Sequence, residues 1–119
     1  MKSDNYKIAK QWLKAFNEHD LDQLIALYDE KAVHLSPKLK LRHPETSGLI
    51  KGKEALHAWW LDAFERLPQL TYVEKTLTVD DENVFMEYLR VVPGEENMNV
   101  AEVLVIKNGK IVASRVYHG

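Results

Sequence analysis

The stretch "NVAEVLVIKNGKIVASRVYHG" (99–119) decides the fold, because it reads as two strands joined by a tight turn. Apolar residues fill both halves, and Asn108-Gly109 between them is typical of a β-hairpin turn. One residue departs from this pattern: Glu102 lies inside the first strand. A carboxylate at a core-facing position costs free energy unless it is paired, hydrogen-bonded or protonated. The direction in which Glu102 points therefore decides whether it can take part in chemistry.

The register of this hairpin has two alternatives. If Asn108-Gly109 is a two-residue turn, Glu102 lies opposite Arg115 and the two form a cross-strand ion pair. If Gly109 belongs to a three-residue loop with a bulge, the register moves by one residue and every side chain changes face. Glu102 then shares a face with Val100, Leu104, Ile106, Val112, Ser114, Val116 and His118. We choose the bulged register, because it gives one apolar wall holding an acid, a hydroxyl and an imidazole.

Three segments have apolar residues at the three- and four-residue spacing that predicts amphipathic helices. They span residues 6–16, 21–28 and 56–67. Asp20 precedes the second segment and is expected to cap it, and Pro68 ends the third.

The remaining segments predict strands. Residues 31–36, "KAVHLS", alternate so that Ala32, His34 and Ser36 share one face. Residues 37–52 have no clear period and are expected to form a long loop. Further strands are expected at 70–79, 84–92, 98–106 and 111–118. Helices followed by antiparallel strands predict an α+β fold, in which three helices close a curved, cone-shaped mixed or antiparallel sheet around an apolar cavity.

The composition limits the possible function classes. A chain of 119 residues is expected to form a single domain, 1–119. A net charge of −2 without a basic cluster argues against a nucleic-acid partner. The chain has no cysteine, no metal-ligand spacing and no phosphate-binding loop, so neither a metal nor a cofactor is expected. No apolar run has the length of a signal peptide or membrane span, which predicts a cytoplasmic protein without membrane contact.

Three stretches resemble a known family: "AFNEHDLDQLIALYDEKAVHLSP" (15–37), "GKEALHAWW" (52–60) and "AEVLVIKNGKIVASRVYHG" (101–119). They are similar to the SnoaL-like branch of the nuclear-transport-factor-2-like, or cystatin-like, superfamily, which includes polyketide cyclases and is related to ketosteroid isomerases. The resemblance covers almost the whole chain. It implies a cone-shaped sheet closed by helices and a homodimer formed through the outer face of the sheet. It does not imply one activity, because this superfamily contains enzymes, binding proteins and accessory domains.

The resemblance maps the isomerase site onto this chain only in part. The aspartate base of the isomerases corresponds to Ser36, and their oxyanion tyrosine on the first helix corresponds to Trp12. Their second oxyanion donor is an aspartic acid held neutral in an apolar site, and it corresponds to Glu102. Steroid isomerase activity is therefore not expected. The cyclases keep an acidic general acid/base on this same strand, a pattern that Glu102 fits better.

These patterns give a candidate catalytic group. Glu102 is expected to act as a general acid/base or neutral hydrogen-bond donor, with His34 and His118 assisting. Glu87 is expected close to Glu102 across the adjoining strands, although the alternation of its strand allows either face. The expected substrate-binding residues are Trp12, Tyr28, Ser36, Trp59, Glu87, Leu104, Ser114 and Val116.

The leading hypothesis is an enzyme of the cyclase or isomerase kind that acts on a small apolar ligand, cyclic or carbonyl-bearing. One alternative is a non-catalytic protein that binds such a ligand in the same pocket. The other is a dimeric interaction module whose cone is filled by Trp12, Trp59 and Trp60.

Overall fold

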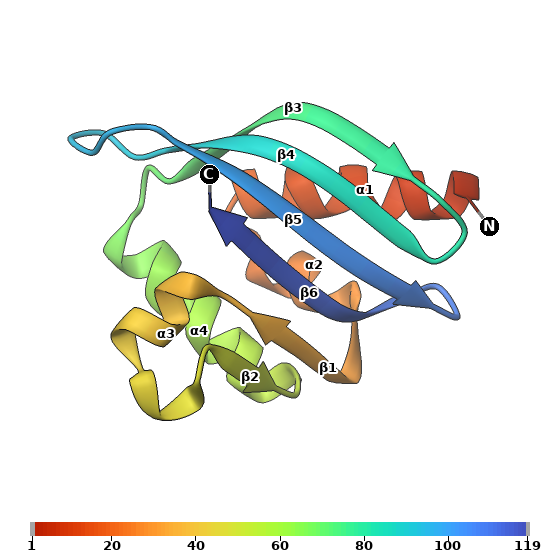
Figure 1. Ribbon diagram of the computed structural model, residues 1–119, viewed down its shortest axis with the longest axis horizontal. Coiled ribbons are helices and arrows are strands. Elements are labelled where there is room, and N and C mark those ends of the chain that lie inside the picture. The colour runs from red at the N-terminus through yellow and green to blue at the C-terminus, as the bar shows by residue number, and fades with distance from the viewer. Residues whose placement is uncertain (1, 119) are drawn as a thin grey trace.

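The computed structural model describes residues 2–118, and across this range six strands form one curved sheet in the order β2-β1-β6-β5-β4-β3 (Figure 1). β1 and β6 run parallel, and the other neighbouring strands are antiparallel. The strands are β1 (Tyr28–Leu35), β2 (Leu49–Lys51), β3 (Thr71–Val79), β4 (Asn83–Val91), β5 (Met98–Lys107) and β6 (Lys110–His118). The helices are α1 (Lys2–Asn17), α2 (Leu21–Ala26), α3 (Pro37–Arg42) and α4 (Lys53–Arg66). The predicted α+β fold with a curved sheet is confirmed.

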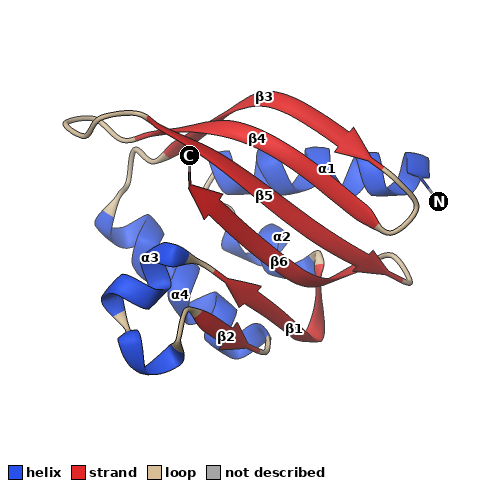
Figure 2. Ribbon diagram, viewed as in Figure 1, coloured by secondary structure: helices blue, strands red, loops and turns tan. Residues whose placement is uncertain are grey.

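The helices cover one face of the sheet, whose two edges do not meet (Figure 2). α1 packs against β3 and β4, whereas α4 packs against β1 and β2. Asp20 caps α2, as predicted, by accepting a hydrogen bond from the backbone N–H of Gln23 at 3.2 Å. In the part of the chain that the structure describes, no helix is long and apolar enough to cross a membrane.

The prediction of a long loop over 37–52 is wrong. This segment forms α3, a short 3-10 helix η1 (Pro44–Thr46) and the edge strand β2, which pairs antiparallel with β1. Pro37 starts α3, where its fixed φ suits the first helical turn. Gly48, between η1 and β2, has a φ of +83°, and a Cβ there would lie 3.1 Å from the carbonyl oxygen of Ser36. Each of these elements is six residues long or shorter. Such short elements do not show a hydrophobic period in the sequence.

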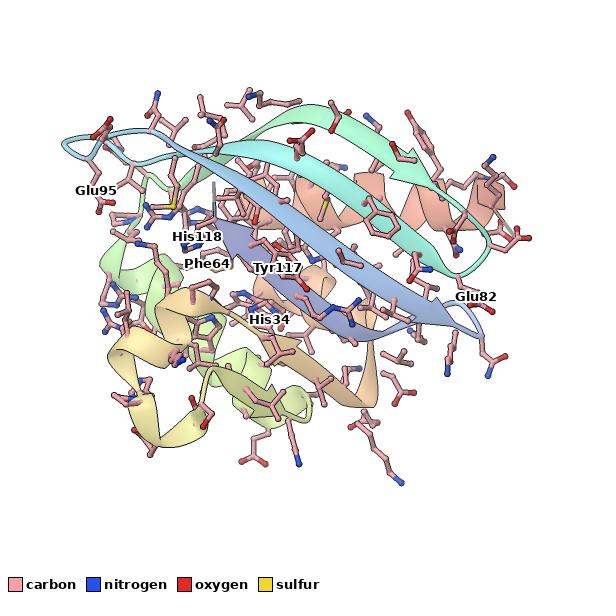
Figure 3. The ribbon with its side chains drawn as sticks, viewed as in Figure 1. His34, Phe64, Glu82, Glu95, Tyr117 and His118 are labelled. Atoms are coloured by element: carbon pink, nitrogen blue, oxygen red, sulfur yellow. The ribbon has the colours of Figure 1, made fainter. Side chains whose placement is uncertain are left out.

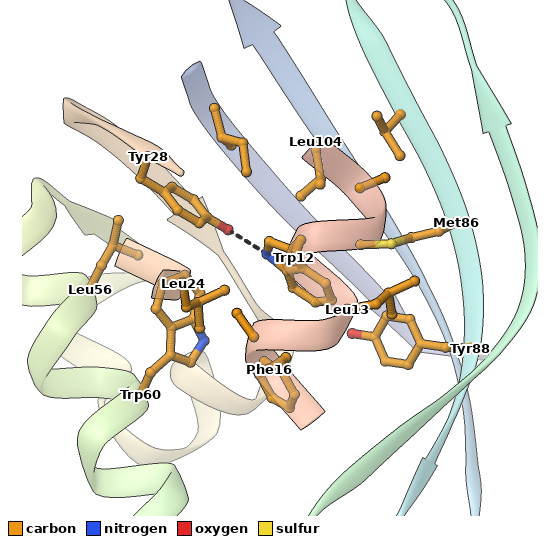
Figure 4. Packing of buried hydrophobic residues seen from close by; sticks show 14 of the residues in the cluster. Trp12, Leu13, Phe16, Leu24, Tyr28, Leu56, Trp60, Met86, Tyr88 and Leu104 are labelled. Carbon is orange, nitrogen blue, oxygen red and sulfur yellow. Dashed lines mark hydrogen bonds between the residues drawn. The ribbon is translucent and has the colours of Figure 1, made fainter. Parts of the chain in front are cut away.

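The core lies between α1 and the inner face of the sheet (Figure 4). Trp12 of α1 is buried and its ring stacks on Phe16, with ring centroids 5.4 Å apart. Met86, Tyr88 and Leu104 reach this layer from the sheet. The aromatic spacing of the first predicted helix therefore marks core packing.

The terminal hairpin combines the two alternative registers. Lys107 pairs with Lys110 across a two-residue turn, in which Asn108 and Gly109 both have positive φ. Next to this turn, Ile106 pairs with Ile111. The following pair is Val105 with Ala113, so Val112 is left unpaired and β6 carries a bulge there.

The bulge decides which way Glu102 faces. It shifts the register by one residue, so Glu102 lies opposite Val116 and not opposite Arg115. The predicted inward orientation of Glu102 is confirmed, whereas the predicted three-residue loop is wrong because the extra residue lies within the strand. Ile111 takes the fully buried place expected for Val112, which is partly exposed.

The outer face of the sheet carries exposed apolar side chains. Val73, Phe85 and Tyr117 are each about half exposed, and Tyr117 is labelled on β6 in Figure 3. A homodimer through this face stays a prediction.

Candidate active site in the cavity

A cavity of about 310 Å³ lies between the inner face of the sheet and helices α1, α3 and α4. This volume is in the range of small-molecule sites. Glu95 and His118 lie at the end of the sheet where the cavity is found, and Glu82 lies at the opposite end (Figure 3). Aromatic rings from α1 and α4, including Trp12 and Trp60, form its apolar walls.

Glu102 is buried in the wall of this cavity, with 2% of its surface exposed. The Tyr88 hydroxyl donates a hydrogen bond to Glu102 Oε1 at 2.6 Å. Burial raises the pKa of the Glu102 carboxyl to about 8, and the hydrogen bond from Tyr88 opposes this rise without cancelling it. Glu102 therefore carries a proton at neutral pH.

The geometry determines which oxygen carries this proton. Oε1 accepts from Tyr88, whereas Oε2 is buried and has no hydrogen-bond partner among the described residues. The proton therefore belongs on Oε2, which is left free to donate to a ligand. An unsatisfied buried polar atom is uncommon and is found at functional sites.

Tyr88 was missed by the sequence analysis. It lies two residues from Met86, which pairs with Glu102 across β4 and β5, so its hydroxyl reaches Glu102 diagonally. Its ring stacks on Tyr72, with centroids 4.0 Å apart, which holds the hydroxyl in place. The alternation of Val84, Met86 and Tyr88 on the apolar face of β4 was the signal that could have found it.

His34 ends a chain of buried hydrogen bonds. Trp12 Nε1–H donates to the Tyr28 hydroxyl at 3.1 Å, and the Tyr28 hydroxyl donates to Ser114 Oγ at 3.1 Å. Ser114 Oγ lies 2.6 Å from His34 Nδ1. Because an indole N–H can only donate, the chain has one direction in which every proton is used, and in it Ser114 donates to Nδ1.

This direction fixes the tautomer of His34. Nδ1 accepts, so the ring proton lies on Nε2, and burial lowers the pKa of His34 to about 4. The neutral ring lines the cavity. His34 therefore offers an N–H donor without a charge.

We expect nuclear magnetic resonance of the ¹⁵N-labelled protein to show His34 as the neutral Nε2–H tautomer at pH 7, with no titration above about pH 5. Ser114→Ala removes the donor to Nδ1 and should weaken the tautomer preference. An Nδ1–H tautomer, or titration near the ordinary value of 6.5, would contradict the proposed direction of the chain.

Seven of the predicted site residues line the cavity: Trp12, His34, Ser36, Trp59, Glu102, Val116 and His118. Tyr28, Leu104 and Ser114, expected to bind substrate, are fully buried and lie behind its wall. Tyr28 and Ser114 contact His34 or its partner, and Leu104 belongs to the core. Their role as substrate-binding residues stays a prediction, but none of the three lines the cavity, because alternation identifies a buried face and not the part of it that borders a cavity.

Glu87 lies on the outer face of the sheet, so its predicted approach to Glu102 is wrong. It pairs with Ala101, and its exposed carboxylate accepts a hydrogen bond from Thr76 Oγ1 at 2.8 Å. The turn between β4 and β5 places Met86 opposite Glu102, so Glu87 points the other way.

Sequence patterns do not predict a group of cations at the end of the cavity near Glu95 and His118, here called its mouth. Lys38, Arg66 and Arg90 line the cavity together with Glu95. Arg90 is 7% exposed and its Nη1 lies 2.9 Å from Glu95 Oε1. These residues come from α3, α4, β4 and the loop after it, so no local motif connects them. Within residues 2–118, no three His, Cys, Asp or Glu side chains come together as a group that could hold a metal ion.

A curved sheet whose helix-covered face encloses a cavity with one buried acid defines a protein of the cystatin-like, nuclear-transport-factor-2-like class. The model of the SnoaL-like domain matches residues 9–114. The chain therefore belongs to the SnoaL-like family. No curated protein matches the sequence.

Solved structures share this fold at low sequence identity. A SnoaL-like protein of unknown function from Burkholderia thailandensis is 22% identical, with a TM-score of 0.89 over 100% of this chain and 97% of that one. A protein from Kribbella flavida, provisionally named a ketosteroid isomerase, is 15% identical, with a TM-score of 0.80 over 99% of this chain and 79% of that one. A protein from Sinorhizobium meliloti, provisionally named a polyketide cyclase, is 18% identical, with a TM-score of 0.76 over 93% and 94% of the two chains. At these identities the likeness concerns the fold alone.

Proposed function

We propose that the protein is an enzyme that binds a small, largely apolar carbonyl compound in the cavity and converts it by proton transfer, as an isomerase or cyclase. The observation that carries this proposal is the buried Glu102 carboxyl, whose side chain lines the cavity and whose Oε2 has no hydrogen-bond partner among the described residues. A protonated acid in an apolar site is suited to donate to a carbonyl oxygen as negative charge develops on it. The names of the Kribbella and Sinorhizobium neighbours agree with this class of chemistry.

Glu102, His34 and His118 have different roles in this reaction. The carbonyl oxygen of the substrate accepts hydrogen bonds from Glu102 Oε2–H and His34 Nε2–H. His118 lines the cavity, and burial together with Lys38 and Arg90 lowers its pKa, so its ring is neutral and acts as the base. Ser36 corresponds to the position of the base in related isomerases, and its hydroxyl makes no hydrogen bond with a side chain among residues 2–118 that would activate it.

The reaction needs no co-reactant. A C–H bond beside the carbonyl breaks, its proton passes to a His118 ring nitrogen, and its electron pair forms the enolate, whose oxygen takes the Glu102 proton and gives an enol. Transfer of the His118 proton to another carbon, with return of the enol O–H proton to Glu102, completes an isomerisation. Attack of the enol carbon on a second carbonyl of the same molecule, with return of the enol O–H proton to Glu102 and transfer of the His118 proton to the new alkoxide, completes a cyclisation.

The test is turnover of a panel of cyclic ketones and enols by the wild-type protein and by Glu102→Gln. Glutamine keeps the shape of the protonated acid but cannot transfer its proton, so we expect a loss of about 10²- to 10⁴-fold in kcat. His57→Gln, at an exposed position on α4, is the matched control and should keep full turnover. A kcat of Glu102→Gln equal to that of the wild-type protein would contradict the proposal.

A non-catalytic ligand-binding protein is the second candidate, because Ser36 stands in place of the isomerase base. In that case no compound turns over, and Glu102→Gln changes only the affinity of the bound compound.

A further inference from the structure

We propose that the ligand of this cavity carries an anionic group, in the simplest case a carboxylate, which Lys38, Arg66 and Arg90 hold at the mouth. This inference rests on the proposed function in one respect: it places the anion and the reacting carbonyl on the same molecule.

More cationic than anionic side chains line the cavity. Four cationic side chains border it, Lys38, Arg42, Arg66 and Arg90, whereas the carboxylates that border it among residues 2–118 are Glu95 and Glu102. Glu102 is protonated at neutral pH, which leaves Glu95 as the one charged carboxylate there. A chain with a formal net charge of −2 therefore concentrates positive charge at its cavity. Such an arrangement attracts anions to a cleft.

Most of these cations have partners. Arg90 binds Glu95 at 2.9 Å, and Asp62 lies 2.8 Å from Arg66 Nε and 3.7 Å from Arg42 Nη2. Lys38 differs, because its ammonium group makes no ion pair or side-chain hydrogen bond with any residue from 2 to 118, and Glu95 acts on it only through its charge. Its ammonium group is the cation with the most freedom to bind a ligand.

The charges of Arg66 and Arg90 are close enough to Lys38 to affect its pKa. The pKa of Lys38 is lowered first by burial and then by the positive charges of Arg90 and Arg66, against the opposing effect of Glu95. The pKa of His118, at the same mouth, is also lowered by burial, by Lys38 and by Arg90. Cations brought this close repel one another, and a bound anion would remove that repulsion.

The position of this group relative to the interior defines the ligand further. The mouth offers cations, the walls offer aromatic rings such as Trp59 and Trp60, and the interior offers the donors of Glu102 and His34. The molecule that matches all three is an aromatic or alicyclic acid with its carboxylate at one end and its carbonyl at the other. An apolar ligand without charge, as predicted from the sequence, leaves the mouth unmatched.

The experiment compares 2-naphthoate with 2-naphthamide, which has the same rings and no charge, by isothermal titration calorimetry at pH 7 in chloride buffer. We expect the wild-type protein to bind 2-naphthoate at least about tenfold more tightly, because an ammonium–carboxylate contact is charge-assisted. Lys38→Met should remove most of this preference and leave the affinity for 2-naphthamide unchanged. Lys40→Met is the matched control, because Lys40 lies on the same helix, is exposed and does not line the cavity.

Equal affinities for the two probes, an unchanged preference in Lys38→Met, or no binding of either probe at millimolar concentration would overturn the inference. The readout is binding without turnover, so it is separate from the test of the proposed function. If the preference depends on Lys38 while no compound turns over, the anion site stands and the enzyme proposal fails. If Glu102→Gln abolishes turnover while the preference is absent, the enzyme proposal stands and the anion site fails.

Discussion

Glu102→Gln is expected to raise the free energy of unfolding at pH 8 by about 3–5 kcal/mol relative to the wild-type protein. Burial raises the pKa of Glu102 from its ordinary 4.5 to about 8 in the folded protein. Between these values the folded state holds a proton that the unfolded state has released. Glutamine has no proton to lose, so its variant escapes this cost.

The sign of the pH dependence follows from the proton count. Because the folded state binds more protons than the unfolded state between about pH 4.5 and 8, the stability of the wild-type protein falls as the pH rises through this window. The contribution of Glu102 is fully favourable below pH 4.5 and is lost as the pH rises through 8. The gain of Glu102→Gln over wild type should therefore be small at pH 5 and largest at pH 8.

Urea denaturation at pH 5, 6, 7 and 8 measures this effect. Glu87→Gln is the control, because Glu87 is exposed on the outer face and its amide can still accept the hydrogen bond from Thr76. Its difference from wild type should stay constant across the series. A gain for Glu102→Gln that does not grow with pH would mean that Glu102 is ionised in the folded protein, and the proposed donor would be absent.

The two expected effects of Glu102→Gln have opposite signs: stability rises and turnover falls. If the role of Glu102 were only structural, its replacement would lower the stability of the protein. A group that destabilises the fold and supports the reaction fits the common trade-off between stability and activity. The unpartnered Oε2 is the atom on which both effects depend.

Periodicity in the sequence predicts the parts of this fold that have long, regular patterns. The helices α1 and α4 and the inward face of β1, which holds Ala32 and His34, follow from apolar spacing. The inward direction of Glu102 follows as well, because only one register of the hairpin gives a uniform apolar face. These elements are long enough for a pattern to repeat.

Other parts depend on single residues or on distant contacts. The bulge at Val112 and the direction of Glu87 each depend on a one-residue shift, which inverts a strand without changing its composition. The hydrogen-bond partner Tyr88 and the cation Lys38 reach the site through tertiary packing. Alternation along β4 indicates only that Tyr88 faces inward, and Lys38 has no local signal; strand pairing and the position of α3 bring them to the cavity.

Trp12→Ala is expected to lower the free energy of unfolding by about 3–5 kcal/mol, as for other buried aromatic residues. Trp12 is 1% exposed, its ring lies 5.9 Å from that of Tyr72, and its N–H begins the hydrogen-bond chain to His34. Alanine would remove the packing of α1 on the sheet and leave Tyr28 without its donor. Thermal or urea unfolding measures the loss.

Trp59→Ala is the matched control, because Trp59 also lines the cavity but is only partly buried. We expect a clearly smaller loss of stability there. The comparison also bears on the alternative in which tryptophans fill the cone, since Trp12 packs in the wall while a cavity of about 310 Å³ remains beside it. If Trp12 and Trp59 contributed equally to stability, both rings would fill the interior of the cone, as in the interaction-module alternative. A large loss for Trp12→Ala alone would mean that one ring supports the wall and the other borders an open site.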